Sequence, residues 1–125
     1  MAVSITISVN GNVTRQLPNI PWHAGMNAQQ AMEQAYQTGT GYSFTLQYFG
    51  TGLGYEVISI DNIASQSSTD AYLFWEFSLN GTPAQEGIDE VSLNDGDQIG
   101  WNYTTYNQAA HAGSRHAAIK AKMSA

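Results

Sequence analysis

The sequence predicts an α+β fold in which a mixed β-sheet packs on one helix. Apolar and polar residues alternate along Val3–Val9, which is the period-two pattern of a half-buried strand. The run Tyr72–Leu79 is a second strand with one fully apolar face, formed by Leu73, Trp75, Phe77 and Leu79. Residues 28–36 instead place their apolar residues at helical spacing. The chain has 125 residues and no cysteine, so we expect one domain that buries a core without disulfides.

The N-terminal segment is predicted to form a β-hairpin. Val3–Val9 supplies the first strand, and Asn10-Gly11-Asn12 supplies residues that tolerate positive φ in a tight turn. A second strand returns over Val13–Leu17. Because proline cannot donate to a central ladder, Pro18 and Pro21 are expected to end it.

The helix is predicted over Ala28–Tyr36. Asn27 is a favourable N-cap residue, and Gln30 three positions later completes the pattern of a capping box. Gly39 and Gly41 are expected to end the helix. The apolar stripe consists of small residues and one methionine, which indicates close packing on a sheet: Ala28, Ala31, Met32 and Ala35.

The remaining strands are predicted from β-rich runs between turn signals. The strands are expected over Tyr42–Phe49, Tyr55–Ile63, Tyr72–Leu79 and around Ile99-x-Trp101-x-Tyr103. The connections are a glycine-rich turn at residues 50–54, a polar loop at residues 64–70, the Asn80-Gly81 turn, a short extended piece at residues 91–93 and a turn at residues 94–97.

The chain is expected to divide into a domain over residues 1–106 and a basic, Ala-rich tail over residues 107–125. The tail is predicted to be helical or frayed. It carries three of the four basic residues in the sequence: Arg115, Lys120 and Lys122.

The charge distribution excludes one class of partner. Only 11% of the residues are charged, against about 25% in an average soluble domain. The net charge is −6, and all ten acidic residues lie between residues 16 and 114, a stretch without Lys or Arg. An acidic body repels phosphate, so nucleic acid is not expected as a partner. No apolar run approaches the length that spans a bilayer.

The N-terminus points to two cellular locations. The chain starts Met-Ala-Val-Ser without a basic region or an apolar signal core. Its polarity comes from Ser, Thr, Asn and Gln, and Lys is scarce, which is more usual in exported proteins. We therefore expect either an exported protein in its mature form or, if Met1 is the native start, a cytoplasmic one.

The second half of the sequence carries a pattern that resembles a known family. The family is a bacterial and animal domain of unknown function, found as the C-terminal β-grasp domain of transcobalamin and intrinsic factor. The resemblance covers roughly residues 2–104. The matching motifs are Trp75-x-Phe77-x-Leu79-Asn80-Gly81, Gly87-Ile88-Asp89, Leu93-x-Asp95-Gly96-Asp97-x-Ile99-x-Trp101-x-Tyr103 and, more loosely, the helix entry Gly25-Met26-Asn27-Ala28.

The resemblance implies a β-grasp fold, with a mixed sheet around one helix. The family is not known for catalysis, and its vertebrate members use this domain as a lid over one face of cobalamin, beside a helical barrel. Two features of the present sequence depart from that pattern. The helical-barrel partner domain is missing from it, and the basic tail after Tyr106 lies outside the family pattern.

The polar clusters of the sequence favour structural roles over metal binding or catalysis. Asn94-Asp95-Gly96-Asp97 lacks the downstream acidic ligand of a calcium loop, so a turn that satisfies its own backbone amides is preferred. His111 and His116 are five residues apart, a spacing that does not share one helical face. The sequence has no nucleophile elbow, zinc-protease motif or phosphate loop, so we expect a protein without enzymatic activity.

The aromatic residues predict a binding function. Three Trp, seven Tyr and four Phe exceed the needs of one small core, and we interpret the excess as contact area for a ligand or partner. The first hypothesis is a module for a small planar ligand, such as a cobalamin-like corrin, with no other cofactor. The alternative is a protein-interaction or assembly domain, including homo-oligomers, that uses its aromatic sheet face or its strand edges. The candidate ligand-binding residues are Trp22, His23, Phe49, Tyr55, Tyr72, Phe74 and Tyr103.

Overall fold

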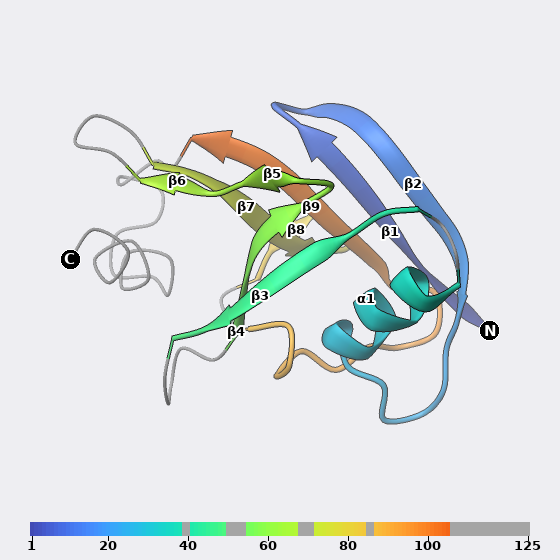
Figure 1. Ribbon diagram of the computed structural model, residues 1–125. Coiled ribbons are helices and arrows are strands. Elements are labelled where there is room, and N and C mark those ends of the chain that lie inside the picture. Colours follow the sequence, from blue (N-terminus) through green and yellow to red (C-terminus); the bar gives the residue numbers. More distant parts are fainter. Residues whose placement is uncertain (39–40, 50–54, 68–71, 85–86, 106–125) are drawn as a thin grey trace.

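The computed structural model describes residues 1–38, 41–49, 55–67, 72–84 and 87–105 (Figure 1). For residues 66, 67 and 72 it describes the backbone alone. The predicted glycine-rich turn at residues 50–54 and the predicted tail at residues 107–125 lie outside the described residues.

The larger sheet is mixed. Its strand order is β2-β1-β9-β7-β6, and β8 pairs with β7. Strand β1 runs parallel to β9, whereas the other pairs are antiparallel. The strands are β1 (Ala2–Val9), β2 (Asn12–Pro21), β6 (Gln66–Ser67), β7 (Tyr72–Leu79), β8 (Thr82–Pro83) and β9 (Gln98–Thr105).

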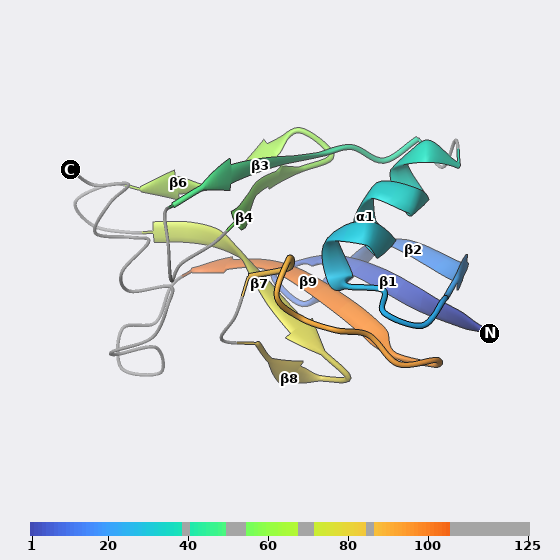
Figure 2. The same ribbon diagram turned by 90° about the horizontal axis from the view of Figure 1, so that it is seen from below.

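A second layer covers one face of this sheet. It contains helix α1 (Ala28–Gln37) and a smaller antiparallel sheet of β3 (Phe44–Tyr48), β4 (Tyr55–Ile60) and β5 (Ile63–Ala64). Figure 2 shows α1 and the β3–β4 pair on the same side of the larger sheet. The predicted α+β class, with a mixed sheet packed on a helix, is confirmed.

The core lies between the two layers and is rich in aromatic rings. Trp101 is 1% exposed and stacks on Phe77, with ring centroids 4.9 Å apart. Its indole Nε1–H points at the sulfur of Met32 on α1, 3.1 Å away. The hydroxyl of the buried Tyr42 donates to the backbone carbonyl of Met32. Met32 therefore connects α1 to the larger sheet through Trp101 and, within its own layer, to Tyr42 just before β3.

The start of α1 confirms the predicted capping box. The side chain of Asn27 accepts a hydrogen bond from the Gln30 amide at 2.8 Å, and the Gln30 side chain accepts one from the Asn27 amide at 2.9 Å. The predicted stripe faces the core, because its four residues are at most 1% exposed: Ala28, Ala31, Met32 and Ala35.

We predict that Asn27→Ala lowers the free energy of unfolding by about 1 kcal/mol, because the Gln30 amide loses its side-chain acceptor and the Asp89 carbonyl loses the hydrogen bond from Asn27 Nδ2. The measurement is urea denaturation followed by circular dichroism. Gln37→Ala, at the exposed end of the same helix, is the control and should stay within about 0.5 kcal/mol of the parent. Equal stability of the two variants would show that the cap contributes nothing.

The predicted end of the second strand is wrong. Strand β2 continues through Pro18 to Pro21, because it lies at the edge of the sheet, where proline is tolerated. Val3 pairs with Ile20 and Ile5 with Leu17, so an extra residue is inserted in β2 between these pairs. Such a β-bulge bends the strand.

Two further predictions need correction. The segment from residue 64 to residue 70 was expected to be a polar loop, but its first part forms the end of β5 and strand β6. The short strand β8 after the Asn80-Gly81 turn was not predicted at all. Two-residue strands carry too few residues for a periodic pattern to identify them.

Candidate functional site

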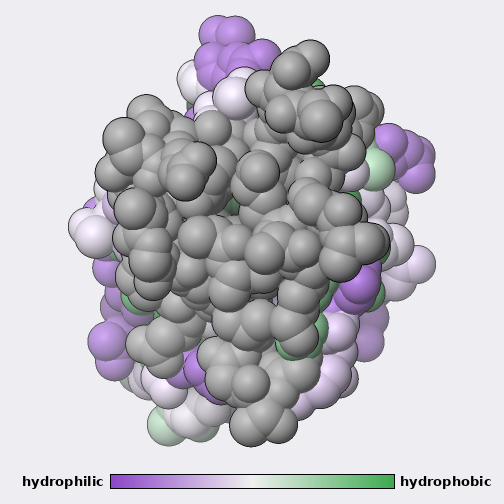
Figure 3. Space-filling view, turned by 90° about the vertical axis from the view of Figure 1, so that its left-hand side faces the viewer, coloured by the Kyte–Doolittle hydropathy of each residue, from purple (hydrophilic) through white to green (hydrophobic). Residues whose placement is uncertain are grey.

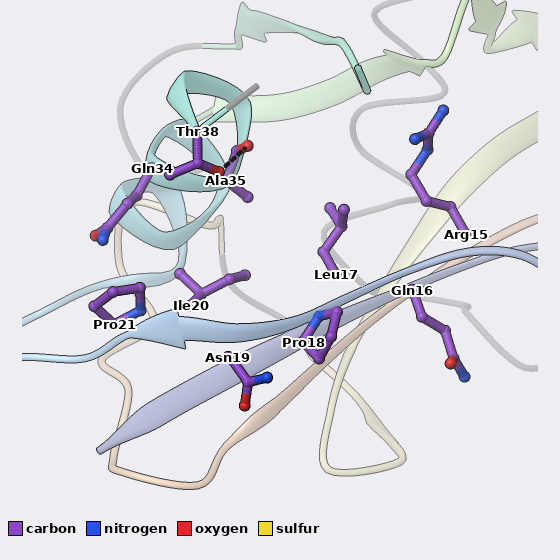
Figure 4. Close-up of a pocket in the computed structure, with 10 residues that line it drawn as sticks. All are labelled: Arg15, Gln16, Leu17, Pro18, Asn19, Ile20, Pro21, Gln34, Ala35 and Thr38. Atoms are coloured by element: carbon purple, nitrogen blue, oxygen red, sulfur yellow. Dashed lines mark hydrogen bonds between the residues drawn. The ribbon is translucent and has the colours of Figure 1, made fainter. Parts of the chain in front are cut away.

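A groove of about 550 Å³ lies between the edge strand β2 and the second half of α1 (Figure 4). It is lined by residues 15–21 of β2 and by Gln34, Ala35 and Thr38 of the helix. This volume falls in the range of roughly 300–1,000 Å³ that is typical of small-molecule sites. The groove was not predicted from the sequence.

The groove has an apolar floor and a polar margin. Leu17 and Ile20 point toward the helix (Figure 4) and are each 5% exposed, and Ala35 is buried opposite them. The bulge at residues 18–19 puts both Leu17 and Ile20 on the side of the helix. Gln34 and the exposed Thr38 form the margin, and the Thr38 hydroxyl donates to the Ala35 carbonyl at 3.0 Å.

An ion pair lies at one end of the groove. The Arg15 Nε–H donates to Asp61 Oδ2 at 3.0 Å. Asp61 also accepts a hydrogen bond from the Ser43 amide at 3.2 Å and returns one to the Ser43 carbonyl. The pair connects β2 to the turn after β4, and it offsets the charge of Arg15 at the groove.

A pair of tyrosines forms a second exposed feature, at the far end of the smaller sheet. Tyr48 on β3 and Tyr55 on β4 are cross-strand partners. Their ring centroids are 5.1 Å apart with an interplanar angle of 51°. Tyr48 is 55% exposed and Tyr55 is 37% exposed. Among the ring pairs in the described part of the chain, this tyrosine pair is the one with both rings exposed.

Three of the predicted ligand-binding rings are buried instead. Phe74 is 0% exposed, Phe49 is 6% exposed and Tyr103 is 8% exposed. The Tyr103 ring packs on Trp75, with centroids 5.1 Å apart, and its hydroxyl donates to the Ala64 carbonyl at 2.7 Å. Burial also raises the pKa of Tyr103. These three rings therefore belong to the interior of the fold and do not supply the exposed contact area that the sequence suggested.

The other predicted residues do not meet at one place. Trp22 is half-buried and donates from Nε1 to the Leu93 carbonyl at 2.9 Å, whereas its neighbour His23 is exposed. Both lie in the loop before α1, whereas Tyr55 begins β4 and donates its amide to Asp89 Oδ1 at 3.5 Å. The structure describes the backbone of Tyr72 alone. None of the seven predicted residues lines the groove.

The turn at residues 94–97 uses its carboxylates on backbone amides, as the sequence predicted. Asp97 accepts from the Asn94 amide at 2.8 Å and from the Asn80 side chain at 3.0 Å. Asp95 accepts from the Ala2 amide at 2.9 Å. Across the described ranges, no three His, Asp or Glu side chains gather into a group that could hold a metal ion.

The comparison with protein families identifies the domain. The family described as a domain of unknown function, DUF4430, matches residues 25–105. The chain belongs to this family. A search of curated proteins found no match.

A solved structure shows that the fold of this DUF4430 domain resembles part of a larger protein. A crystal structure of haptocorrin in complex with Cbi matches with a TM-score of 0.65 and 18% sequence identity. The match covers 84% of the present chain and 25% of the haptocorrin chain, so the DUF4430 domain corresponds to about a quarter of that protein. The predicted resemblance to the transcobalamin family is confirmed at the level of fold.

Described residues are visible mainly at the margins of the face of the DUF4430 domain in Figure 3. Hydrophilic residues predominate among them, with hydrophobic ones scattered between. Within the described ranges, no helix has the length and apolar character needed to cross a membrane.

Proposed function

We propose that this domain is a non-catalytic binding module for a small planar ligand, and that a corrin of the cobalamin kind is the leading candidate. The observation that carries the proposal is the tyrosine pair, Tyr48 and Tyr55. Two adjacent rings that stay more than a third exposed offer aromatic contact area to a ligand.

The chemistry of the pair suits a flat conjugated molecule. A tyrosine ring offers a large apolar face with few torsions to restrict, and its hydroxyl can remain in water or donate to a ligand. The two rings are tilted by 51°. One ring can therefore lie flat against a planar ligand, while the other meets its rim with its edge, an arrangement that aromatic systems favour.

The family supports this class of ligand. The sequence resembles a domain that serves as a lid over one face of cobalamin, and the fold resembles part of haptocorrin, whose structure was solved in complex with Cbi. A lid contacts its ligand from one side, and the tyrosine pair would supply such a one-sided contact. Trp22 and His23 lie in the loop before α1, not on the strands that carry Tyr48 and Tyr55. Contact of Trp22 and His23 with the ligand remains a prediction.

The direct test is a titration of the full chain with cobalamin. We expect a saturable change in the visible spectrum of cobalamin at high micromolar concentration or below. Isothermal titration calorimetry then gives the Kd. The absence of both a spectral change and a heat of binding would refute the corrin ligand.

The tyrosine pair has a closely matched control residue on α1. Tyr48→Ala is expected to weaken binding roughly tenfold, which corresponds to about 1.4 kcal/mol. Tyr36 on α1 has the same 55% exposure as Tyr48, so Tyr36→Ala should leave the Kd unchanged. Equal effects of the two variants would argue against the tyrosine pair as the binding site.

A further inference from the structure

Phe74 on β7 is buried on a side of the larger sheet where the described residues place no second layer. Side chains alternate along a strand, so Phe74 points away from Trp75, whose indole N–H donates to the Ile63 carbonyl of β5. Figure 2 shows α1 and the smaller sheet together on one side of the larger sheet. The cluster of buried side chains between these layers includes Trp75 and Phe77 but not Phe74. Phe74 is nevertheless 0% exposed.

The rest of this outer side is polar. On β7 and β9, the other described side chains that share it are partly or fully exposed: Glu76, Ser78, Gln98, Asn102 and Thr104. A fully buried phenylalanine among exposed polar neighbours indicates a local cover over one end of the sheet. A complete second layer would bury the neighbours as well. The cover comes from a part of the chain outside the described ranges.

The position of Phe74 in the sheet favours the C-terminal tail as the cover. Phe74 pairs with Thr104, one residue before the end of β9 at Thr105. The tail over residues 107–125 therefore leaves the sheet beside Phe74, and it contains several alanines together with Ile119 and Met123. Residues 68–71, which precede β7, are Ser, Thr, Asp and Ala, and they offer little apolar area to cover a ring.

Charge favours the same segment. The tail has no acidic residue, and it carries Arg115, Lys120 and Lys122, whereas all ten acidic residues of the chain precede it. Glu76 lies two positions after Phe74, on the same side of β7, and is half-buried. A basic segment over Phe74 therefore meets an opposite charge at Glu76. Because pairs of this kind near the surface contribute little, most of the contact energy comes from covering the ring.

We propose that the outer side of β7 around Phe74 is a docking surface for the chain's own basic tail, residues 107–125. Apolar side chains of the tail cover the Phe74 ring, and its basic side chains lie against Glu76. The tail is then part of the folded unit and not a separate appendage. This contact does not depend on the proposed planar ligand, because the tyrosine pair lies on the smaller sheet.

A nitroxide label on the tail of the full chain tests the contact. The chain has no cysteine, so Ser114→Cys provides a single labelling position. We expect the amide NMR signals of Glu76 and Thr104 to broaden strongly. The signal of Gln29 should keep its intensity, since Figures 1 and 2 show α1 near the opposite end of β9. Unbroadened signals at Glu76 and Thr104 would overturn the proposal.

Two matched pairs of variants identify the surface. Phe74→Ala should lower the ratio of docked to undocked tails roughly tenfold, whereas Tyr48→Ala, which removes an exposed ring of β3, should not change it. Glu76→Gln should lower the same ratio roughly twofold, and Glu33→Gln on the exposed side of α1 should leave it unchanged. Circular dichroism confirms that the variants fold. Equal broadening within both pairs would overturn the proposal, and the glutamate pair decides if Phe74→Ala does not fold.

A mixed sample excludes a second copy as the occupant. It contains ¹⁵N-labelled chains without nitroxide and unlabelled chains with nitroxide. If the tail docks on its own chain, the signals of Glu76 and Thr104 keep their intensity in this sample. Broadening of these signals in the mixture would show that the tail binds another copy, and it would overturn docking within the chain.

Discussion

Replacing Trp101 with alanine is expected to lower the free energy of unfolding by about 3–5 kcal/mol. The indole is 1% exposed and lies between the two layers of the fold. It stacks on Phe77 at 4.9 Å and directs its N–H at the Met32 sulfur. Its removal leaves a cavity that the surrounding strands and helix cannot fill by small shifts.

Urea denaturation measures this effect. A loss of this size is a large fraction of the stability of a domain, which is about 5–15 kcal/mol, so the variant should unfold at a much lower urea concentration. Tyr48→Ala, which removes an exposed ring and its cross-strand contact with Tyr55, should cost no more than about 1 kcal/mol. A Trp101→Ala variant as stable as Tyr48→Ala would mean that the two layers do not pack as described.

Alkaline pH is expected to destabilise the protein through Tyr42. Burial raises the pKa of Tyr42 well above the usual value near 10, and the carboxylates of Asp61 and Glu33 raise it further. The unfolded chain therefore loses this proton at a lower pH than the folded chain does. The contribution of Tyr42 to stability is complete below pH 10 and is lost as the pH rises toward the folded pKa, at up to about 1.4 kcal/mol per pH unit.

The variant Tyr42→Phe isolates this effect. At pH 8 it should cost about 1 kcal/mol, because the hydrogen bond to the Met32 carbonyl is lost. Above pH 10 the stability of the variant should fall less steeply with pH than that of the parent. The two slopes should differ by the equivalent of about one proton, which is the proton of Tyr42. Tyr103 also has a raised pKa, but it is present in both proteins and does not contribute to the difference. Parallel pH profiles would contradict the raised pKa of Tyr42.

The sequence predicted those elements that short-range patterns determine. The N-terminal hairpin follows from strict alternation and from Asn10-Gly11, whose φ angles of 51° and 81° the turn requires. The helix follows from its capping box and its apolar stripe. Each signal lies within a few residues of the structure that it specifies, so no tertiary contact was needed to interpret it.

The features that depend on tertiary contacts were missed. Periodicity cannot show that β2 is an edge strand, and only an edge strand continues past Pro18. The groove lies between β2, at its bulge, and the small residue Ala35 of the helix, and periodicity alone shows neither the bulge nor this neighbour. One sequence signal could have indicated the bulge, namely an asparagine next to Pro18. Asparagine tolerates a positive φ, and Asn19 has a φ of 60° in the structure.

The candidate site was predicted in part. Tyr55 was singled out and is exposed, but its partner Tyr48 was counted among the surplus rings and not among the site residues. Phe74 was expected to offer a second aromatic face of β7, yet it is 0% exposed. Composition counts rings but does not show which of them the fold encloses, and this explains why three of the seven predicted residues are buried: Phe49, Phe74 and Tyr103.

The central claim is that Tyr48 and Tyr55 together form a contact surface for a flat ligand. The most direct measurement is an NMR titration of the full chain, with ring-¹³C-labelled tyrosines assigned by single Tyr→Phe substitutions, against cobalamin. We predict that the ring signals of Tyr48 and Tyr55 shift and saturate together, while those of Tyr36 do not move. Shifts at other tyrosines with Tyr48 and Tyr55 unchanged, or no shift at any ring, would contradict the claim.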